Sequence, residues 1–124
     1  MSGEDSKVCE GGPTLIFACS GAADVGEISD RAARKMTKDG IGTMFCLAGI
    51  GGKVEPIMQK TKSASKILAI DGCGLDCVKG CLEQAGFNEF KHLRITDFGM
   101  NKGSSPATDE NVSAFITKAK NLLD

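Results

Sequence analysis

Residues 14–47 read TLIFACSGAADVGEISDRAARKMTKDGIGTMFCL. The first six residues are short and apolar enough for a buried strand, and the five from Thr43 onward repeat that character. Between these two runs, apolar side chains recur every three or four residues, which is the period of one helix face. They are Val25, Ile28, Ala32 and Met36. Gly40 suits the left-handed residue that ends a helix. The segment therefore predicts a strand, a helix and a second strand in succession.

The same alternation continues through the rest of the chain. We expect further strands at residues 67–70 and 92–96, helices at 54–61, 75–85 and 108–123, and loops at 48–52 and 97–107. Strands that alternate with helices form right-handed crossover units around a parallel sheet. The last strand is the most polar, so we expect it at the sheet edge. The sequence predicts an α/β three-layer sandwich with a mainly parallel sheet of about four strands, of the flavodoxin-like or half-Rossmann type.

Length and composition limit the classes of function. The 124 residues suit one domain, which we expect at 14–124 after a polar, glycine-rich N-terminal arm at 1–13. The net charge of −1 argues against nucleic-acid binding, because such domains are strongly basic. There is no apolar run of about 20 residues and no signal-like start, so we expect no membrane association and a cytoplasmic location. In that compartment thiols stay reduced, and numerous cysteines more often bind metal or do redox work.

Three cysteines recur at a regular interval. Cys19, Cys46 and Cys73 are 27 residues apart in each step, and each follows a predicted strand. The carboxyl ends of parallel strands share one edge of the sheet, where open α/β folds bind ligands. Cys77 would lie in the first turn of the next helix. Any one of these cysteines taken alone is most simply a small buried hydrophobe. Four at one edge suit a tetrahedral Zn²⁺ site or, alternatively, an iron–sulfur cluster.

Neighbouring residues suggest how such a site would be supported. Asp71 and Gly72 precede Cys73, and we expect them to hold the surrounding loop without coordinating the ion. An equal alternative for Asp71 is a cap of the turn at Gly72. Four thiolates on Zn²⁺ carry a net charge of −2, which loop N–H groups, helix N-termini and Lys53 could offset.

The remaining cysteines and the histidine have simpler interpretations. Cys81 lies one helical turn beyond Cys77, so we expect it to pack within the domain. Cys9 precedes the first strand and would start at the opposite edge of the sheet, as a free surface thiol. His92 is the only histidine, and we expect a solvated or partly packed side chain on the edge strand.

Four short motifs occur together in this order: FACSG (17–21), FCLAGI (45–50), DGC (71–73) and Cys77. From Pro13 to the end, the chain resembles the DGC-domain family, which is named for the last tripeptide and carries four candidate zinc-chelating cysteines. The resemblance implies that these are Cys19, Cys46, Cys73 and Cys77. It includes neither Cys9 nor Cys81, and it supplies no reaction, so we assign no enzymatic activity.

The leading hypothesis is therefore a cytosolic zinc-binding protein whose four-cysteine site lies at the carboxyl edge of the sheet. One alternative is a thiol–disulfide redox enzyme or sensor, in which Cys73 or Cys77 is activated at a helix N-terminus and a neighbouring thiol resolves it. The lack of a C-x-x-C pair counts against it. An iron–sulfur protein is a further alternative, although the usual C-x₂-C-x₂-C spacing is absent. The protein partner, if there is one, is not defined by the sequence.

Overall fold

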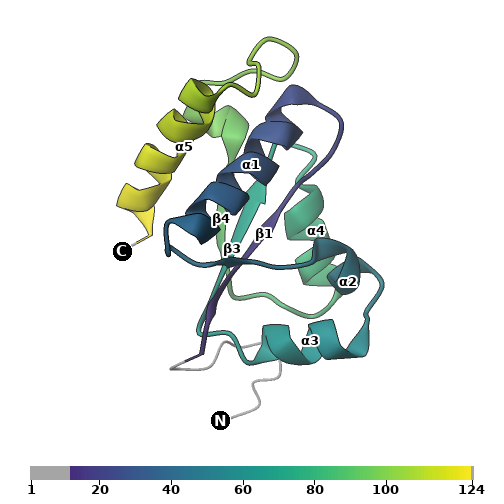
Figure 1. Ribbon diagram of the computed structural model, residues 1–124. Helices are drawn as coiled ribbons and strands as arrows, with labels where there is room; N and C mark the ends of the chain where they lie inside the picture. Colours follow the sequence, from purple (N-terminus) through teal and green to yellow (C-terminus); the bar gives the residue numbers. More distant parts are fainter. Residues whose placement is uncertain (1–11, 124) are drawn as a thin grey trace.

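A computed structural model describes residues 12–123 (Figure 1). The elements follow in the order β1 (Thr14–Ala18), α1 (Asp24–Lys38), β2 (Thr43–Met44), α2 (Leu47–Gly51), α3 (Glu55–Lys62), β3 (Lys66–Asp71), α4 (Cys77–Gln84), β4 (Lys91–Arg94), the 3₁₀ helix η1 (Ile95–Phe98) and α5 (Asp109–Leu122). The four strands form one parallel sheet with helices on both faces. The predicted α/β sandwich is thus confirmed, whereas the finer flavodoxin-like assignment stays a prediction.

The strand order is β2-β1-β3-β4, which puts β4 at an edge as expected. Ile16 pairs with Met44 of β2, and Ala18 pairs with Ile70 of β3. The chain leaves β1 toward β2 on one side and returns to form β3 on the other. The order therefore reverses between β1 and β3, and the carboxyl ends of these two strands flank the crevice where open α/β sheets place their ligands.

Side chains of the central strands point alternately to the two faces of the sheet, where they pack into two apolar cores. Ile16 and Ile70 face α1 and α5, where Ile28, Met36 and Phe115 complete the first core. The opposite face carries Leu15, Phe17, Ile67 and Ala69, which pack with Ile50 of α2 and with Val78 and Leu82 of α4. Figure 1 shows the same division, with α1 and α5 side by side and α2, α3 and α4 across the sheet. The core is therefore complete on both faces of the sheet.

Three local predictions are wrong. The second strand ends at Met44, and residues 47–51 form α2 rather than a loop, because the sulfur of Cys46 caps this helix. Leu75 is 74% exposed and precedes α4, which begins only at Cys77. The fourth strand ends at Arg94, and buried Ile95 begins η1 instead of continuing the strand.

The N-terminal arm lies almost entirely outside the described residues, and so does Cys9. The division of the chain at residue 13 therefore stays a prediction. Among residues 12–123, no helix combines the length and the apolar character that crossing a bilayer requires.

Candidate functional site

Cys19 directly follows β1 at the sheet's ligand-binding edge. Its backbone N–H donates to the carbonyl oxygen of Ile70 at 2.9 Å, which extends the pairing with β3 by one residue. Its Sγ accepts a hydrogen bond from the N–H of Gly21 at 3.4 Å. The side chain is partly buried against the core that faces α4. Cys19 is thus held in place by both strands that flank the crevice.

Cys46 lies at the outer end of the same edge, beyond β2. It is the N-cap of α2, where its Sγ accepts the N–H of Gly49 at 3.3 Å. Serine, threonine and aspartate usually perform this role, so the thiol here satisfies an otherwise free helix donor. The side chain is exposed and borders an open surface cavity of about 790 Å³. Cys46 is consequently accessible from solvent.

Cys73 and Cys77 lie on either side of the short turn between β3 and α4. Cys73 is partly buried against the core that faces α1, and its Sγ lies 3.9 Å from Nζ of Lys102. Cys77 is the first residue of α4 and is exposed. The thiol of Cys73 is therefore partly buried, whereas that of Cys77 is exposed to solvent.

The charges around Cys77 show how far these thiols converge. Burial by the surrounding atoms raises the pKa of the Cys77 thiol, and electrostatic repulsion of its thiolate form by four neighbours raises it further: Cys19, Asp71, Cys73 and Cys81. All five cysteines within the described part of the chain are free thiols. In residues 12–123, however, no three cysteine sulfurs lie within 4.8 Å of one another. The structure thus brings Cys19, Cys73 and Cys77 into one electrostatic neighbourhood, but not into contact with a common centre.

Asp71 fixes the start of α4 through backbone hydrogen bonds. It is only 1% exposed, and its carboxylate accepts the backbone N–H of Val78 at 2.7 Å and of Lys79 at 3.1 Å. It therefore caps α4 from the end of β3, across seven residues. Nε2 of His92 lies 2.8 Å from the same carboxylate. The sequence led us to expect that Asp71 would hold the surrounding loop, and the structure shows that the groups it binds are the start of α4 and His92.

Gly72 is required by a close approach of backbones. A Cβ atom at this position would lie 2.9 Å from the backbone nitrogen of Gly26 and 3.0 Å from the carbonyl group of Val25. Real Cβ contacts below 3.0 Å are essentially never seen, so a side chain would push α1 away from the turn. The D-G-C tripeptide thus has three separate tasks: a helix cap, a close contact with α1, and a thiol.

The turn that carries Cys73 and Cys77 is anchored by β4. Asp76 adopts a left-handed conformation, with φ of 53°, which non-glycine residues rarely adopt. Arg94 holds it with two hydrogen bonds, from Nε at 2.8 Å and from Nη2 at 2.7 Å. Because the side chain of Asp76 is bound to Arg94, Asp71 takes over the capping of α4.

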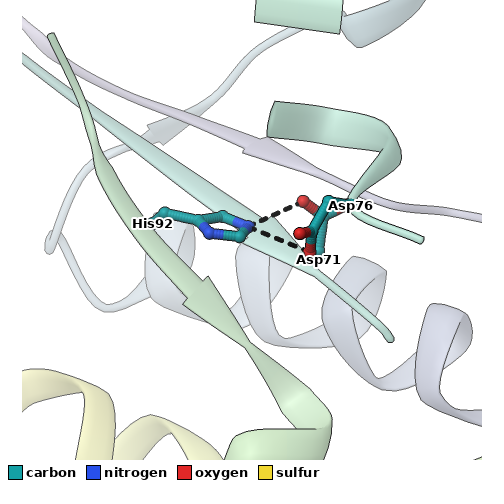
Figure 2. Close-up of side chains that lie close together, drawn as sticks. All are labelled: Asp71, Asp76 and His92. Carbon is teal, nitrogen blue, oxygen red and sulfur yellow. Dashed lines mark hydrogen bonds and ion pairs between the residues drawn. The ribbon is translucent and has the colours of Figure 1, made fainter. Parts of the chain in front are cut away.

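Figure 2 shows the ring of His92 pointing toward the carboxylates of Asp71 and Asp76. One ligand-type atom from each of these residues lies within 4.8 Å of the others. The carboxylate oxygens are already engaged, by backbone N–H groups at Asp71 and by Arg94 at Asp76. We therefore interpret the group as a polar network that stabilises the turn.

The partly packed His92 was expected, but its partner was not. Ala69 pairs with His92 in the sheet, and Asp71 lies two residues beyond Ala69 on the same face of β3. This register is the signal that places the histidine beside the carboxylate. The sequence does not contain the register, because it depends on how two distant strands align.

The Asp76–Arg94 ion pair predicts an acid-dependent stability. The hydrogen bonds from Arg94 lower the pKa of Asp76 below its ordinary value of 3.8. A carboxyl group with a lowered folded-state pKa stabilises the fold above the ordinary pKa, and this contribution disappears as the pH falls through the lowered one. We expect Asp76→Asn to be less stable than the wild type at neutral pH and to lose less stability between about pH 4 and pH 2. Urea unfolding of the two proteins across this pH range measures both differences. If the two proteins lost equal stability between about pH 4 and pH 2, the ion pair would not be the source of the acid dependence.

These features define a small α/β protein with free thiols gathered at the carboxyl edge of a parallel sheet. The DGC domain family matches residues 15–119, so the chain belongs to this family. A relative from Pseudomonas aeruginosa, "Anaerobic and virulence modulator AnvM", is 36% identical over 88 residues, which are 71% of this chain and 67% of the relative. No solved structure matches the chain. The family membership is consistent with a small metal-binding protein.

Proposed function

We propose that this protein binds one Zn²⁺ ion through the thiolates of Cys19, Cys46, Cys73 and Cys77. The observation that carries the proposal is the placement of these thiols, which follow three neighbouring strands and begin one helix at the same edge. Four thiolates in a tetrahedral arrangement are a preferred ligand set of zinc. When bound, the ion would neutralise part of the negative charge of the sulfurs and tie the three loops together.

The electrostatic surroundings favour a cation over an unassisted reactive thiol. A redox enzyme needs a thiolate, which is favoured by a lowered pKa. The pKa of Cys77 is instead raised, by burial and by electrostatic repulsion from neighbouring cysteines and Asp71. A cation bound among Cys19, Cys73 and Cys77 would relieve this repulsion. The redox hypothesis therefore has less support at Cys77 than metal binding has.

Binding has to bring the sulfurs closer together. Zinc–sulfur bonds of about 2.3 Å place the ligand sulfurs roughly 3.8 Å apart. The described thiols do not meet this spacing in any group of three, since none lies within 4.8 Å throughout. Cys46 and Cys77 are exposed, so they can rearrange and an ion can enter from solvent. We infer an exchangeable ion, which suits a regulatory role such as the one in the name of the Pseudomonas relative.

The test is the metal content of protein purified under reducing conditions, together with its absorption after cobalt substitution. We expect about one equivalent of zinc and the visible bands of tetrahedral cobalt thiolate. Serine at any one of the four proposed ligand positions should abolish stoichiometric binding. Cys81→Ser is the matched control, because Cys81 packs against the core that faces α4. This variant should retain the metal.

Other results of these measurements would favour one of the alternative hypotheses. A brown protein that contains iron would favour the iron–sulfur alternative. A metal-free protein that reversibly forms a disulfide through Cys73 or Cys77 would favour the redox alternative. Loss of zinc in Cys81→Ser, with retention in Cys46→Ser, would mean that the ligand set is wrong. We place the protein in the reducing cytoplasm, where all of these thiols remain available.

A further inference from the structure

Lys102 is the cationic side chain found in contact with one of the proposed sulfur ligands. Its Nζ lies 3.9 Å from Sγ of Cys73, although the two residues are 29 positions apart in the sequence. Lys53, the cation suggested by the sequence, makes no hydrogen bond or ion pair with a cysteine in the described part of the chain. It lies exposed beyond α2, and its backbone N–H donates to Ile50. The lysine that is placed to offset the thiolate charge is therefore Lys102 and not Lys53.

The loop that carries Lys102 is fixed to the start of α1. Both carboxylate oxygens of Asp24 accept the N–H of Gly103, at 2.9 and 3.0 Å, and one also accepts the N–H of Ser105 at 3.1 Å. Gly103 has a φ of +94°, a conformation that side chains rarely adopt. Figure 1 shows this loop, between η1 and α5, above the first turn of α1. The backbone directly after Lys102 is therefore tied to the start of α1, while the Lys102 side chain itself is exposed.

A positive charge at this position meets a specific need. Zn²⁺ with four thiolates carries a net charge of −2, which is costly beside an apolar core. Cys73 is the proposed ligand that packs against the core that faces α1. The N–H groups of Gly21 and Gly49 already serve Cys19 and Cys46. The ammonium of Lys102 supplies the corresponding stabilisation to Cys73, with a full charge.

We propose that Lys102 is a positioning residue that stabilises the metal-bound thiolates through Cys73, and that Asp24 holds the loop that presents it. This inference rests on the proposed zinc site. It adds that the affinity of the site depends on a charge supplied from outside the cysteine motifs, near the other end of the chain. It also predicts that the metal and the loop at residues 101–105 stabilise one another, because binding is linked in both directions.

The test is competitive titration of Zn²⁺ against a chromophoric chelator with the full chain. We expect Lys102→Gln to weaken zinc affinity about fivefold, as for the stronger exposed charge pairs, and Lys102→Glu to weaken it roughly 25-fold. Lys102→Arg should restore affinity to about that of the wild type, since it restores the charge. Lys53→Gln is the matched control and should leave the affinity unchanged.

Two further measurements separate a charge effect from a structural one. The difference between wild type and Lys102→Gln should shrink in 1 M salt, where screening acts within about 3 Å. Lys102→Gln should cost less affinity in an Asp24→Asn background than in the wild type, because the two residues act through one loop. The urea midpoint of metal-free Lys102→Gln should match that of the wild type.

The outcomes distinguish this inference from the proposed function. Equal zinc affinity in wild type, Lys102→Gln and Lys102→Glu would overturn the inference and leave the zinc site standing. Failure of Lys102→Arg to restore affinity, or a loss that does not respond to salt, would also overturn it. If the wild type itself takes up no zinc, both the proposed function and this inference are wrong.

Discussion

Replacing Asp71 with alanine is expected to lower the free energy of unfolding by about 3–5 kcal/mol, at about 1–3 kcal/mol for each buried hydrogen-bonding group left without its partner. The carboxylate is 1% exposed and holds three donors: the N–H groups of Val78 and Lys79 and Nε2 of His92. Alanine would leave all three without this acceptor. Urea denaturation at neutral pH measures the loss.

The large effect follows from the absence of a substitute cap. The N-cap residue of α4 is Asp76, but it makes no side-chain capping bond, because Arg94 holds both of its carboxylate oxygens. The first N–H groups of a helix have no partner within the helix. Only Asp71 satisfies those of Val78 and Lys79 within the described structure. Loss of Asp71 therefore exposes the helix start and frees the turn that carries Cys73.

Two companion variants sharpen this result. Asp71→Asn keeps the shape and one acceptor oxygen but not the charge, so we expect it to cost less than alanine, about 1–3 kcal/mol. Asp97→Ala is the control, because Asp97 is the more exposed of the two carboxylates on Arg94 and its removal should cost less than about 1 kcal/mol. A loss for Asp71→Ala as small as that for Asp97→Ala would show that α4 does not depend on this cap.

The order of the elements follows from periodicity in the sequence. The helical stripe from Val25 to Met36 is buried in α1, as its spacing predicts. The polar fourth strand lies at the edge, where only one neighbour pairs with it. The helical stripe is local, because all of its members lie within the 15 residues of α1, and the polarity of the fourth strand is a property of its own residues. The α/β class could therefore be predicted before any coordinates were known.

The polar network could not be predicted, because its members come from separate segments. Asp76 adopts a left-handed conformation, and Arg94, 18 residues later, binds its side chain. His92 reaches Asp71 only through the register of β3 and β4. Lys102 lies beside Cys73 on a loop that is bound to Asp24, far away in the sequence. Such contacts depend on tertiary packing, which periodicity within one segment does not encode.

The strand order puts these cysteines at the edge that the sequence predicts, whereas their role as metal ligands stays a prediction. Counting strands places Cys19 and Cys73 at one edge, and in the structure they follow the neighbouring strands β1 and β3 there. The distance between sulfurs depends on where each strand stops. The second strand stops at Met44, and the sulfur of Cys46 turns back to cap α2. This local helix cap holds the side chain of Cys46, and an ion bound there would have to compete with it.

Gly72→Ala is expected to cost about 3 kcal/mol, at the upper end of the usual penalty for overpacking. A flexible side chain can move away from an added methyl group, but the atoms nearest to Gly72 are backbone atoms of Val25 and Gly26, 2.9–3.0 Å from the new Cβ. The methyl group would therefore shift the first turn of α1 as a unit. Asp24 begins that turn and holds the loop of Lys102, so zinc affinity should fall together with stability.

Gly74→Ala is the matched control for this prediction. Gly74 lies in the same turn, two residues away, and a Cβ atom there would meet nothing within 4 Å. Its substitution should change the free energy of unfolding by no more than about 0.5 kcal/mol. Urea denaturation and zinc titration of the two alanine variants, side by side, separate the close approach from any general intolerance of the turn. If Gly72→Ala matched Gly74→Ala in both measurements, the glycine of the D-G-C tripeptide would not be needed for packing against α1.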